Sequence, residues 1–309
     1  MRILITGGAG FIGSHVADAC LAAGHDALIV DDLSTGQRKN LPAGAEFAEG
    51  DIRDATFVGK TLASFKPDIV SHQAAQTSVS ISAREPVLDA EINVLGTLNL
   101  LNACVDNQVE RVIFASTGGA IYGEVPDGEL AALDWKPRPL SPYACSKFAI
   151  EGYLVCYQAE HSLQSTVLRY SNVYGPRQDP HGEAGVVAIM SRRALDDEPM
   201  TVFARVSEGD EGCVRDYVYV DDVVRANMAA ISGSLEQPMI NVCTGIGTST
   251  YALAKEIADI AGAKSEIGFG PRRPGDVERS VLDPGSPPPL GEAVPLEVGL
   301  RATVDSFRS

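Results

Sequence analysis

A glycine-rich turn between a short apolar strand and an apolar helix is the feature that most constrains this chain. Residues 2–6 form an apolar run typical of a buried strand, and the turn follows as Gly7-Gly8-Ala9-Gly10-Phe11-Ile12-Gly13. Apolar periodicity over 14–23 predicts a helix, and 27–30 predicts a second strand that ends at Asp31. Together these segments predict one βαβ unit of a doubly wound α/β fold with a parallel sheet.

Three glycines of the turn each have a physical task. Gly7 permits a tight turn out of the strand, Gly10 lets a ligand approach the backbone, and Gly13 allows the helix to pack closely on the sheet. The N-terminus of the helix presents unpaired N–H groups and a partial positive charge, which favour a diphosphate. The turn therefore predicts a dinucleotide site with Phe11 and Ile12 among its contacts. The alternative is a flavodoxin-like turn that binds no dinucleotide.

The carboxylate at the end of the second strand indicates which dinucleotide binds. Asp31 lies 18 residues beyond Gly13, where it can accept both hydroxyls of an adenosine ribose. The same carboxylate would repel the 2′-phosphate of NADP. The sequence therefore predicts NAD as the cofactor.

The net charge of the chain limits its partners. A formal net charge of −16 over 309 residues argues against binding to nucleic acid or to an anionic membrane. An anionic substrate would have to be met by local arginines. The longest apolar runs are strand-sized, well below the roughly 20 residues of a membrane span. Since Met1 leads directly into the first strand, no signal peptide is expected, and we predict a cytoplasmic protein.

The cysteines and histidines favour reduced thiols and argue against a metal site. Six cysteines lie in helix- or strand-like patterns without C-x-x-C spacing, which suits a cytoplasm: Cys20, Cys104, Cys145, Cys156, Cys213 and Cys243. Five histidines form no pair with the spacing of metal ligands on a helix: His15, His25, His72, His161 and His181.

Three motifs carry a resemblance to a known family. The opening run Thr6 to Gly13 resembles the G-x-x-G-x-x-G turn of the extended short-chain dehydrogenases/reductases. A Y-x-x-x-K motif follows as Tyr143-Ala144-Cys145-Ser146-Lys147, and residues 169–176 are similar to the family's R-Y-x-N-V-Y-G-P signature. Over roughly residues 1–283 the chain is identified as a member of the NAD-dependent epimerase/dehydratase family. The resemblance implies a Rossmann-type doubly wound parallel sheet with a smaller C-terminal substrate-binding lobe.

The Y-x-x-x-K motif carries the predicted chemistry. Tyr143 and Lys147 are four residues apart, so on a helix they share one face, where the ammonium can stabilise a phenolate. A strand over 111–115 ends in Ser116-Thr117, and Thr117 is the expected hydroxyl that binds the same substrate oxygen. Because the following loop is one residue longer than usual in the family, Ser116 remains an alternative. The other reading of the tyrosine and lysine is an exposed surface pair.

Several further residues are expected to contact the cofactor. Small residues after the fourth strand, at Gln73, Ala74 and Ala75, allow the backbone to approach it. By the resemblance, Asp32, Asp51 and Ile52 flank the adenine, Asn93 ties a helix over 86–107 to the cofactor region, and Ser171 lies by the nicotinamide. Asp51 has an alternative role as the N-cap of the next helix. Asn93 has one as a helix-to-loop hydrogen-bonding residue.

The resemblance also implies a UDP-sugar substrate. Asn172 and Arg215 match residues that contact the sugar-nucleotide diphosphate, and Arg273 and Asp276 match a second phosphate and ribose clamp. Arginine suits both places because its planar fork grips phosphate oxygens and stays charged. The alternative for either arginine is a surface ion pair.

The implied reaction is inversion at C4 of a UDP-glucose or UDP-galactose type of sugar through a transient 4-keto sugar. Other nucleotide-sugar epimerases, acting on N-acetylglucosamine or uronate forms, remain open. A 4,6-dehydratase is disfavoured because Gly118-Gly119 follow Thr117 where dehydratases carry Asp-Glu. A non-enzymatic dinucleotide sensor is disfavoured because a sensor needs no general base, whereas this chain has Thr117, Tyr143 and Lys147 together.

The domain organisation follows the same motifs. We expect an NAD-binding domain over 1–170, rejoined by about 216–245, and a substrate-binding lobe over 171–215 and 246–309. The proline-rich residues 284–295 cannot be helical, and their role is open. Two helices, 86–107 and 143–160, carry more apolar faces than one sheet can cover, so we predict a homodimer.

Overall fold

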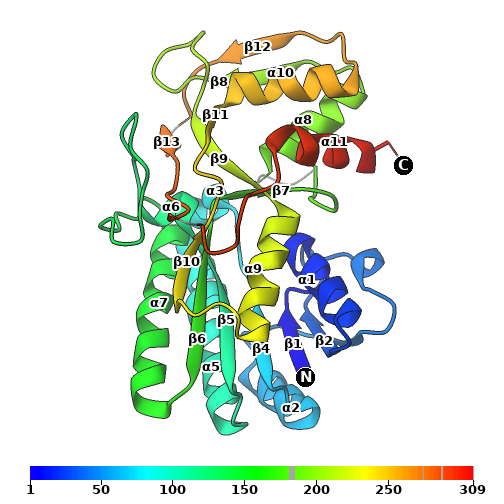
Figure 1. Ribbon diagram of the computed structural model, residues 1–309, viewed down its shortest axis with the longest axis vertical. Coiled ribbons are helices and arrows are strands. Elements are labelled where there is room, and N and C mark those ends of the chain that lie inside the picture. The colour runs from blue at the N-terminus through cyan, green and yellow to red at the C-terminus, as the bar shows by residue number, and fades with distance from the viewer. Residues whose placement is uncertain (181–184, 274, 287, 309) are drawn as a thin grey trace. The chain divides into compact units, whose positions relative to one another are not determined.

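The computed structural model describes residues 1–180, 185–273, 275–286 and 288–308 (Figure 1). His181, Pro274 of the expected ribose clamp and Pro287 of the proline-rich segment lie outside these residues. The chain forms two compact units. The first unit comprises 1–117, 141–169 and 224–240, and the second comprises 118–140, 170–223 and 241–309.

A seven-stranded sheet organises the first unit. Its strand order is β10-β6-β5-β4-β1-β2-β3, and β1 pairs in parallel with both β2 and β4. The order reverses at β1, which is the topological switch point where doubly wound sheets bind ligands. The Rossmann-type fold expected from the glycine turn is confirmed. The strands are β1 (Arg2–Thr6), β2 (Asp26–Asp31), β3 (Glu46–Glu49), β4 (Ile69–His72), β5 (Arg111–Thr117), β6 (Gln164–Tyr170) and β10 (Met239–Val242).

Helices cover both faces of this sheet because its strands are buried on both sides. One face packs against α2 (Ala55–Phe65), α5 (Thr97–Asp106) and α7 (Pro142–His161) through a single apolar cluster. The opposite face packs against α1 (Phe11–Ala22). Successive strand residues point to opposite faces, so continuous apolar runs such as that of β1 satisfy both layers.

The long helix expected over 86–107 contains a π-helical turn. It consists of α4 (Pro86–Ala90), the π-helical segment η2 (Glu91–Gly96) and α5. Gly96 lies at the end of this turn, where a Cβ would come within 2.8 Å of the Ile52 side chain. π-turns inside helices are frequent at functional sites.

The N-cap of α2 is Asp54 and not Asp51. The Asp54 side chain accepts hydrogen bonds from the backbone N–H groups of Thr56 and Phe57. Asp51 lies one turn too early and instead bonds Arg53. The alternative role assigned to Asp51 from the sequence is therefore wrong.

The second unit contains two small sheets. Strand β9 (Val214–Tyr219) pairs with β7 (Asn172–Tyr174), β11 (Gly247–Ser249) and β13 (Arg279–Ser280), while β8 (Met200–Phe203) pairs with β12 (Ile267–Gly270). Its helices are α6 (Gly118–Ile121), α8 (Val186–Leu195), α10 (Thr250–Ala261) and α11 (Leu296–Ser306). Three further segments are α3 (Val79–Arg84) and the 3₁₀ turn η1 (Arg38–Asn40) in the first unit, and α9 (Val220–Ser232), which runs through both units.

Residues 118–140 belong to the second unit, whereas the expected division placed them in the first. The backbone N–H groups of Val125 and Ala131 donate to the carbonyls of Arg279 and Val281. The Arg279 guanidinium, 9% exposed, also donates to the carbonyls of Pro126 and Glu129. These contacts are long-range in sequence, so composition alone does not reveal them.

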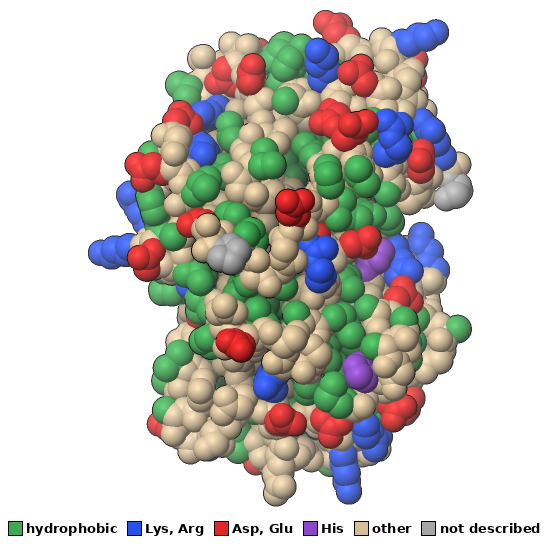
Figure 2. Space-filling model, viewed as in Figure 1, with side chains coloured by type: hydrophobic (Ala, Val, Ile, Leu, Met, Phe, Trp, Pro, Cys, Tyr) green, Lys and Arg blue, Asp and Glu red, His purple; other side chains and the backbone are tan. Residues whose placement is uncertain are grey.

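The surface carries the acidic excess in scattered form. Figure 2 shows acidic and basic side chains interspersed over the visible face. Within the described residues, no helix combines the length and apolar character that crossing a bilayer requires. Nor does any group of three or more His, Cys, Asp and Glu side chains in that part of the chain converge to hold a metal ion.

The close packing of α1 on the glycine turn yields a stability prediction. A Cβ at Gly13 would lie 2.2 Å from the carbonyl oxygen of Gly7, so Gly13→Ala should destabilise the fold by about 1–3 kcal/mol. Gly59 is the matched control, since it lies within α2 and a Cβ there would meet nothing within 4 Å. Gly59→Ala should be neutral or should stabilise by about 0.5–1 kcal/mol. Urea unfolding of both variants tests this, and equal midpoints would contradict it.

Candidate active site

The glycine turn forms a tight cradle at the switch point of the sheet. Gly7 has φ +67°, and a Cβ there would lie 2.7 Å from the backbone nitrogen of Ala74. In the described chain, no side chain caps the N-terminus of α1, which begins at Phe11 after the N-cap Gly10. The first-turn N–H groups, including that of Ile12, therefore point toward solvent or ligand. This geometry fits a dinucleotide diphosphate.

Asp31 lies at the carboxyl end of β2 with its carboxylate fixed. One oxygen accepts from the N–H of Ala9 at 3.0 Å and the other from the N–H of Leu33 at 2.9 Å. Burial raises the pKa of Asp31, and the two backbone hydrogen bonds oppose that rise. Each carboxylate oxygen can still accept a further hydrogen bond, as a ribose diol requires.

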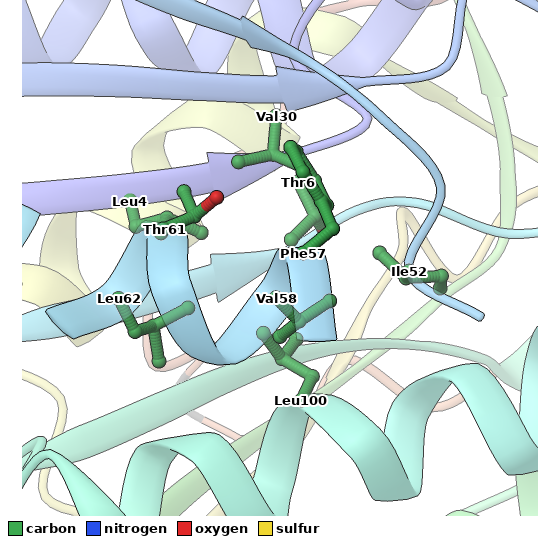
Figure 3. A pocket seen from close by; sticks show the side chains of 9 residues that line it. All are labelled: Leu4, Thr6, Val30, Ile52, Phe57, Val58, Thr61, Leu62 and Leu100. Carbon is green, nitrogen blue, oxygen red and sulfur yellow. The ribbon is translucent and has the colours of Figure 1, made fainter. Parts of the chain in front are cut away.

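The residues expected around the adenine differ in their surroundings. Asp32 accepts from both the N–H and the hydroxyl of Ser34, so its own loop holds it. The Arg53 guanidinium, 2.5 Å away, lowers the pKa of Asp51. Figure 3 shows Ile52 at a narrow apolar gap, together with side chains from β1, β2, α2 and α5: Leu4, Thr6, Val30, Phe57, Val58, Thr61, Leu62 and Leu100.

The segment after β4 follows the back of the glycine turn. The N–H of Gln73 donates to the carbonyl of Thr6, and the N–H of Ala74 donates to its hydroxyl at 3.2 Å. The Gln73 amide is held by the side chains of Ser71 and Asn227. Ala75 is half-buried beside them. The sequence placed these residues at the cofactor, and the structure brings them against Gly7.

Asn93 joins the π-turn to the segment after β4. Its Oδ1 accepts from the N–H of Gln76 at 3.0 Å, and its Nδ2 donates to the carbonyl of Gln76 and to Asp89. Asn93 is 2% exposed. The alternative role of a helix-to-loop bond is therefore present, and it fixes the segment beside the cradle.

Thr117 and Tyr143 meet by a side-chain hydrogen bond. Burial raises the pKa of Tyr143 to about 12, the bond with Thr117 lowers it, and the negative charge of Asp89 raises it. Among the described residues, Thr117 and Asp89 are the side chains that shift this pKa. The chain's own groups therefore keep the phenol protonated at neutral pH. Lys147, which was expected to stabilise the phenolate, is not one of the groups that shift this pKa.

Lys147 lies one helical turn beyond Tyr143 and is 3% exposed. Its Nζ donates to the carbonyl of Ala115 at 2.9 Å and lies 4.9 Å from the ring centre of Phe114. Burial lowers the pKa of Lys147 to about 8, and Asp89 opposes this. The alternative reading of an exposed tyrosine–lysine pair is wrong, because the lysine is buried.

The structure separates the roles of the two neighbouring hydroxyls. Ser116 donates to Glu151 at 2.6 Å, and Glu151 forms a buried ion pair with Arg169 at 2.6 Å. Since strand residues alternate in direction, Thr117 points away from this pair and toward Tyr143. The geometry therefore favours Thr117 over Ser116 as the hydroxyl beside the tyrosine.

One residue of the first unit, Asp89, acts on Tyr143 through its charge and was missed by the sequence reasoning. Asp89 is fully buried and accepts from the Ser146 hydroxyl at 2.6 Å. Its position in the largely apolar residues 86–96, four residues before Asn93, was the available signal. It places Asp89 on the same helical face as Asn93.

In the second unit, Asn172 lies on β7, Arg215 lies on the paired strand β9, and Ser171 directly precedes β7. Asn172 lies opposite Tyr217 in the register of these strands. The Ser171 hydroxyl donates to Asp216 at 3.3 Å. Asp216 is fully buried and also accepts from Thr244, Gly245 and Leu282, so it fixes the end of β9 beside Arg215.

Arg215, Arg273 and Asp276 also converge around the thiol of Cys213. Burial raises the pKa of the Cys213 thiol most. The charge of Asp276 also raises this pKa, whereas the two arginines lower it. Arg273 pairs with Asp276 at 3.0 Å and lies over the ring of Phe203. The structure thus brings together, within the second unit, two arginines that are far apart in sequence.

Comparisons with known proteins agree with this architecture. Residues 3–243 match the family described as NAD dependent epimerase/dehydratase. A UDP-glucose 4-epimerase from Mycolicibacterium smegmatis is 43% identical over 317 residues, which cover 100% of this chain and 99% of the relative.

Two solved structures are also similar over 100% of this chain and 99% of theirs. A Thermus thermophilus UDP-glucose 4-epimerase in complex with NAD is 51% identical with a TM-score of 0.95. A UDP-glucose 4-epimerase from Thermotoga maritima with UDP-glucose is 46% identical with a TM-score of 0.93. With a Rossmann-type sheet, a glycine cradle and matches along its whole length, the chain belongs to the NAD dependent epimerase/dehydratase family.

Proposed function

We propose that this chain is an NAD-dependent isomerase that inverts C4 of UDP-glucose or UDP-galactose. The observation that carries the proposal is the Thr117–Tyr143 hydrogen bond, one turn from buried Lys147, in the unit that contains the glycine cradle. Full-length similarity to proteins that are named UDP-glucose 4-epimerases supports the choice of reaction.

The proposed roles follow from the chemistry of each group. Thr117 binds the 4-hydroxyl of the sugar, and Tyr143 removes its proton as the general base. When bound, NAD would supply the hydride chemistry at C4, first as acceptor and then as donor. Lys147, one helical turn beyond Tyr143, contributes a buried positive charge to this region. Gly7, Gly10, Gly13 and Asp31 hold the diphosphate and the ribose, and the carboxylate of Asp31 excludes NADP.

Replacing the base should separate binding from chemistry. Tyr143→Phe keeps the ring and loses the hydroxyl, so we expect NAD binding to remain and turnover of UDP-galactose to fall at least about a hundredfold. The assay uses purified protein without added NAD, because the hydride returns to the same sugar and no net oxidation occurs. Near-normal turnover in this variant would contradict the role of Tyr143.

We assign the diphosphate of the substrate to Arg215 and Arg273. A buried Oδ1 of Asn172 with no hydrogen-bond partner among the described residues lies on β7, which pairs with the strand of Arg215. Arg273 is 59% exposed, so its pairing with Asp276 leaves donors for a ligand.

The arginine assignment has a direct test. Arg215→Ala and Arg273→Ala should each weaken UDP binding about ten- to a hundredfold, because a charge-assisted contact to phosphate contributes roughly 1.5–3 kcal/mol. Arg192→Ala is the control, since Arg192 pairs with Asp196 on its own helix. Calorimetric titration with UDP measures the affinity of all three variants. Unchanged affinity in both test variants would show that these arginines form surface ion pairs and do not bind the diphosphate.

A dehydratase reaction is less favoured by the surroundings of Thr117. Gly118 and Gly119 follow it and transfer no proton. Glu124, the nearest carboxylate in sequence, accepts from the N–H groups of Glu278 and Arg279 and so has a structural task. The choice of sugar has its own test. Parallel assays with UDP-galactose and UDP-N-acetylgalactosamine distinguish an epimerase for plain hexoses from one for N-acetylated sugars.

A homodimer formed through α4, η2 and α7 is part of the proposal. These segments pack side by side and expose apolar residues: Val87 (69%), Leu95 (55%), Phe148, Tyr153 and Val155. Two such helical faces per subunit suit a four-helix bundle about a two-fold axis. The six cysteines are all free, which is consistent with the cytoplasm that we propose for it.

The dimer has a mutational test with a matched control. Val87→Glu combined with Leu95→Glu should convert the protein to a 32.6-kDa monomer and reduce turnover as well, because α7 carries Tyr143. Val298→Glu, on exposed α11, should change neither. Light scattering after size exclusion gives the mass. A fully active wild-type monomer in dilute solution would overturn the dimer.

A further inference from the structure

Asp89 is a buried acid whose hydrogen bonds join residues beside the candidate site. It is fully buried at the end of α4 and accepts three hydrogen bonds: from the Gln76 amide at 2.8 Å, from the Asn93 amide at 3.0 Å and from the Ser146 hydroxyl at 2.6 Å. All three partners are donors toward it, which suits an ionised carboxylate. Ser146 directly precedes Lys147 on α7.

The surroundings of Lys147 make Asp89 its counter-charge. His72, on β4, is uncharged near neutrality because burial and Lys147 lower its pKa to about 3. Glu151, one turn further along α7, is paired with Arg169. Tyr143, one turn before, is a neutral phenol. Among the described residues, Asp89 is the group that counteracts the loss of the proton from Lys147.

We infer that Asp89 is a positioning residue for the proposed reaction: it neutralises the buried ammonium of Lys147 and holds α7 to the segment after β4 through Ser146 and Asn93. The inference rests on the proposed function. A buried ammonium without a partner is unfavourable and loses its proton instead. With Asp89, Lys147 remains largely protonated at neutral pH, as its pKa of about 8 implies.

Asp89→Asn separates charge from geometry. The amide oxygen can accept from Gln76 and Asn93, and the amide nitrogen can donate to the Ser146 hydroxyl, which can reverse its role. The hydrogen bonds therefore survive while the negative charge is lost. Because Asp89 raises the pKa values of both Lys147 and Tyr143, its neutralisation lowers both.

The expected result is a displacement of the whole pH profile of kcat toward acid. Its alkaline limb should move down by about one pH unit, so turnover at pH 9 falls about tenfold relative to wild type. A second readout needs no turnover: the ¹³Cε resonance of Lys147, identified by its loss in Lys147→Met, should titrate at correspondingly lower pH. An unmoved profile and an unmoved resonance would overturn the inference.

Two controls isolate the charge. Ser146→Ala removes one hydrogen bond and keeps the carboxylate, so its profile should stay in place even where kcat falls; a shift equal to that of Asp89→Asn would overturn the charge role. Asp89→Glu keeps the charge and should retain the wild-type profile. If Asp89→Asn does not fold, a shifted profile in Asp89→Glu is the contradicting outcome.

The failure of the proposed function is distinguishable. If wild-type protein does not interconvert UDP-galactose and UDP-glucose, the function is wrong, while the titration of Lys147 in the two Asp89 variants still tests the electrostatic role. If wild type is active and neither readout moves, the function stands and the role of Asp89 fails.

Discussion

A buried chain of hydrogen bonds holds the candidate site together. The N–H of Ala74 donates to the Thr6 hydroxyl, which in turn bonds Nδ1 of His72 at 2.7 Å. On the other side of the ring, Nε2 bonds Thr97 at 2.9 Å, and Thr97 donates to the carbonyl of Asn93. Because burial keeps the ring neutral, one tautomer satisfies all these directions: Nδ1 accepts and Nε2 donates. Leaving one such buried group unpaired costs roughly 1–3 kcal/mol, so the cradle, β4 and the π-turn are held as one piece.

Local patterns in the sequence predicted the parts of this architecture that local physics decides. The cradle follows from the backbone freedom of Gly7 and the close approach at Gly13, which no other residue allows. The fixed carboxylate of Asp31 follows from its place at a strand end. The four-residue spacing of Tyr143 and Lys147 placed both on one helical face, and the strand-end position brought Thr117 to the tyrosine.

Other features depend on local backbone geometry or on contacts between distant segments, and the sequence analysis did not predict them. Asp54 and Asp51 are both acids near the start of α2, and only the backbone geometry selects Asp54 as the N-cap. Asp89 lies two residues before the π-turn, and its partner Ser146 lies on α7, 57 residues further along the chain. Likewise, the sequence analysis did not connect Glu151 with Arg169, its buried ion-pair partner on β6. Asp89 and Glu151 have partners that are distant in sequence, whereas the N-cap of α2 depends on local backbone geometry.

The protonation states of Tyr143 and Lys147 make the site dependent on its cofactor. Burial moves both groups toward their neutral forms, with the pKa of the phenol raised to about 12 and that of the ammonium lowered to about 8. Thr117 favours the phenolate, and Asp89 favours the ammonium while opposing the phenolate. The chain alone therefore stabilises a cationic lysine beside a neutral tyrosine, and ionising the phenol requires a further positive charge. An oxidised nicotinamide is cationic, so under the proposed function NAD⁺ would supply this charge and make Tyr143 an effective base. In the reaction that we propose, proton abstraction would then be restricted to the complex that can also accept the hydride.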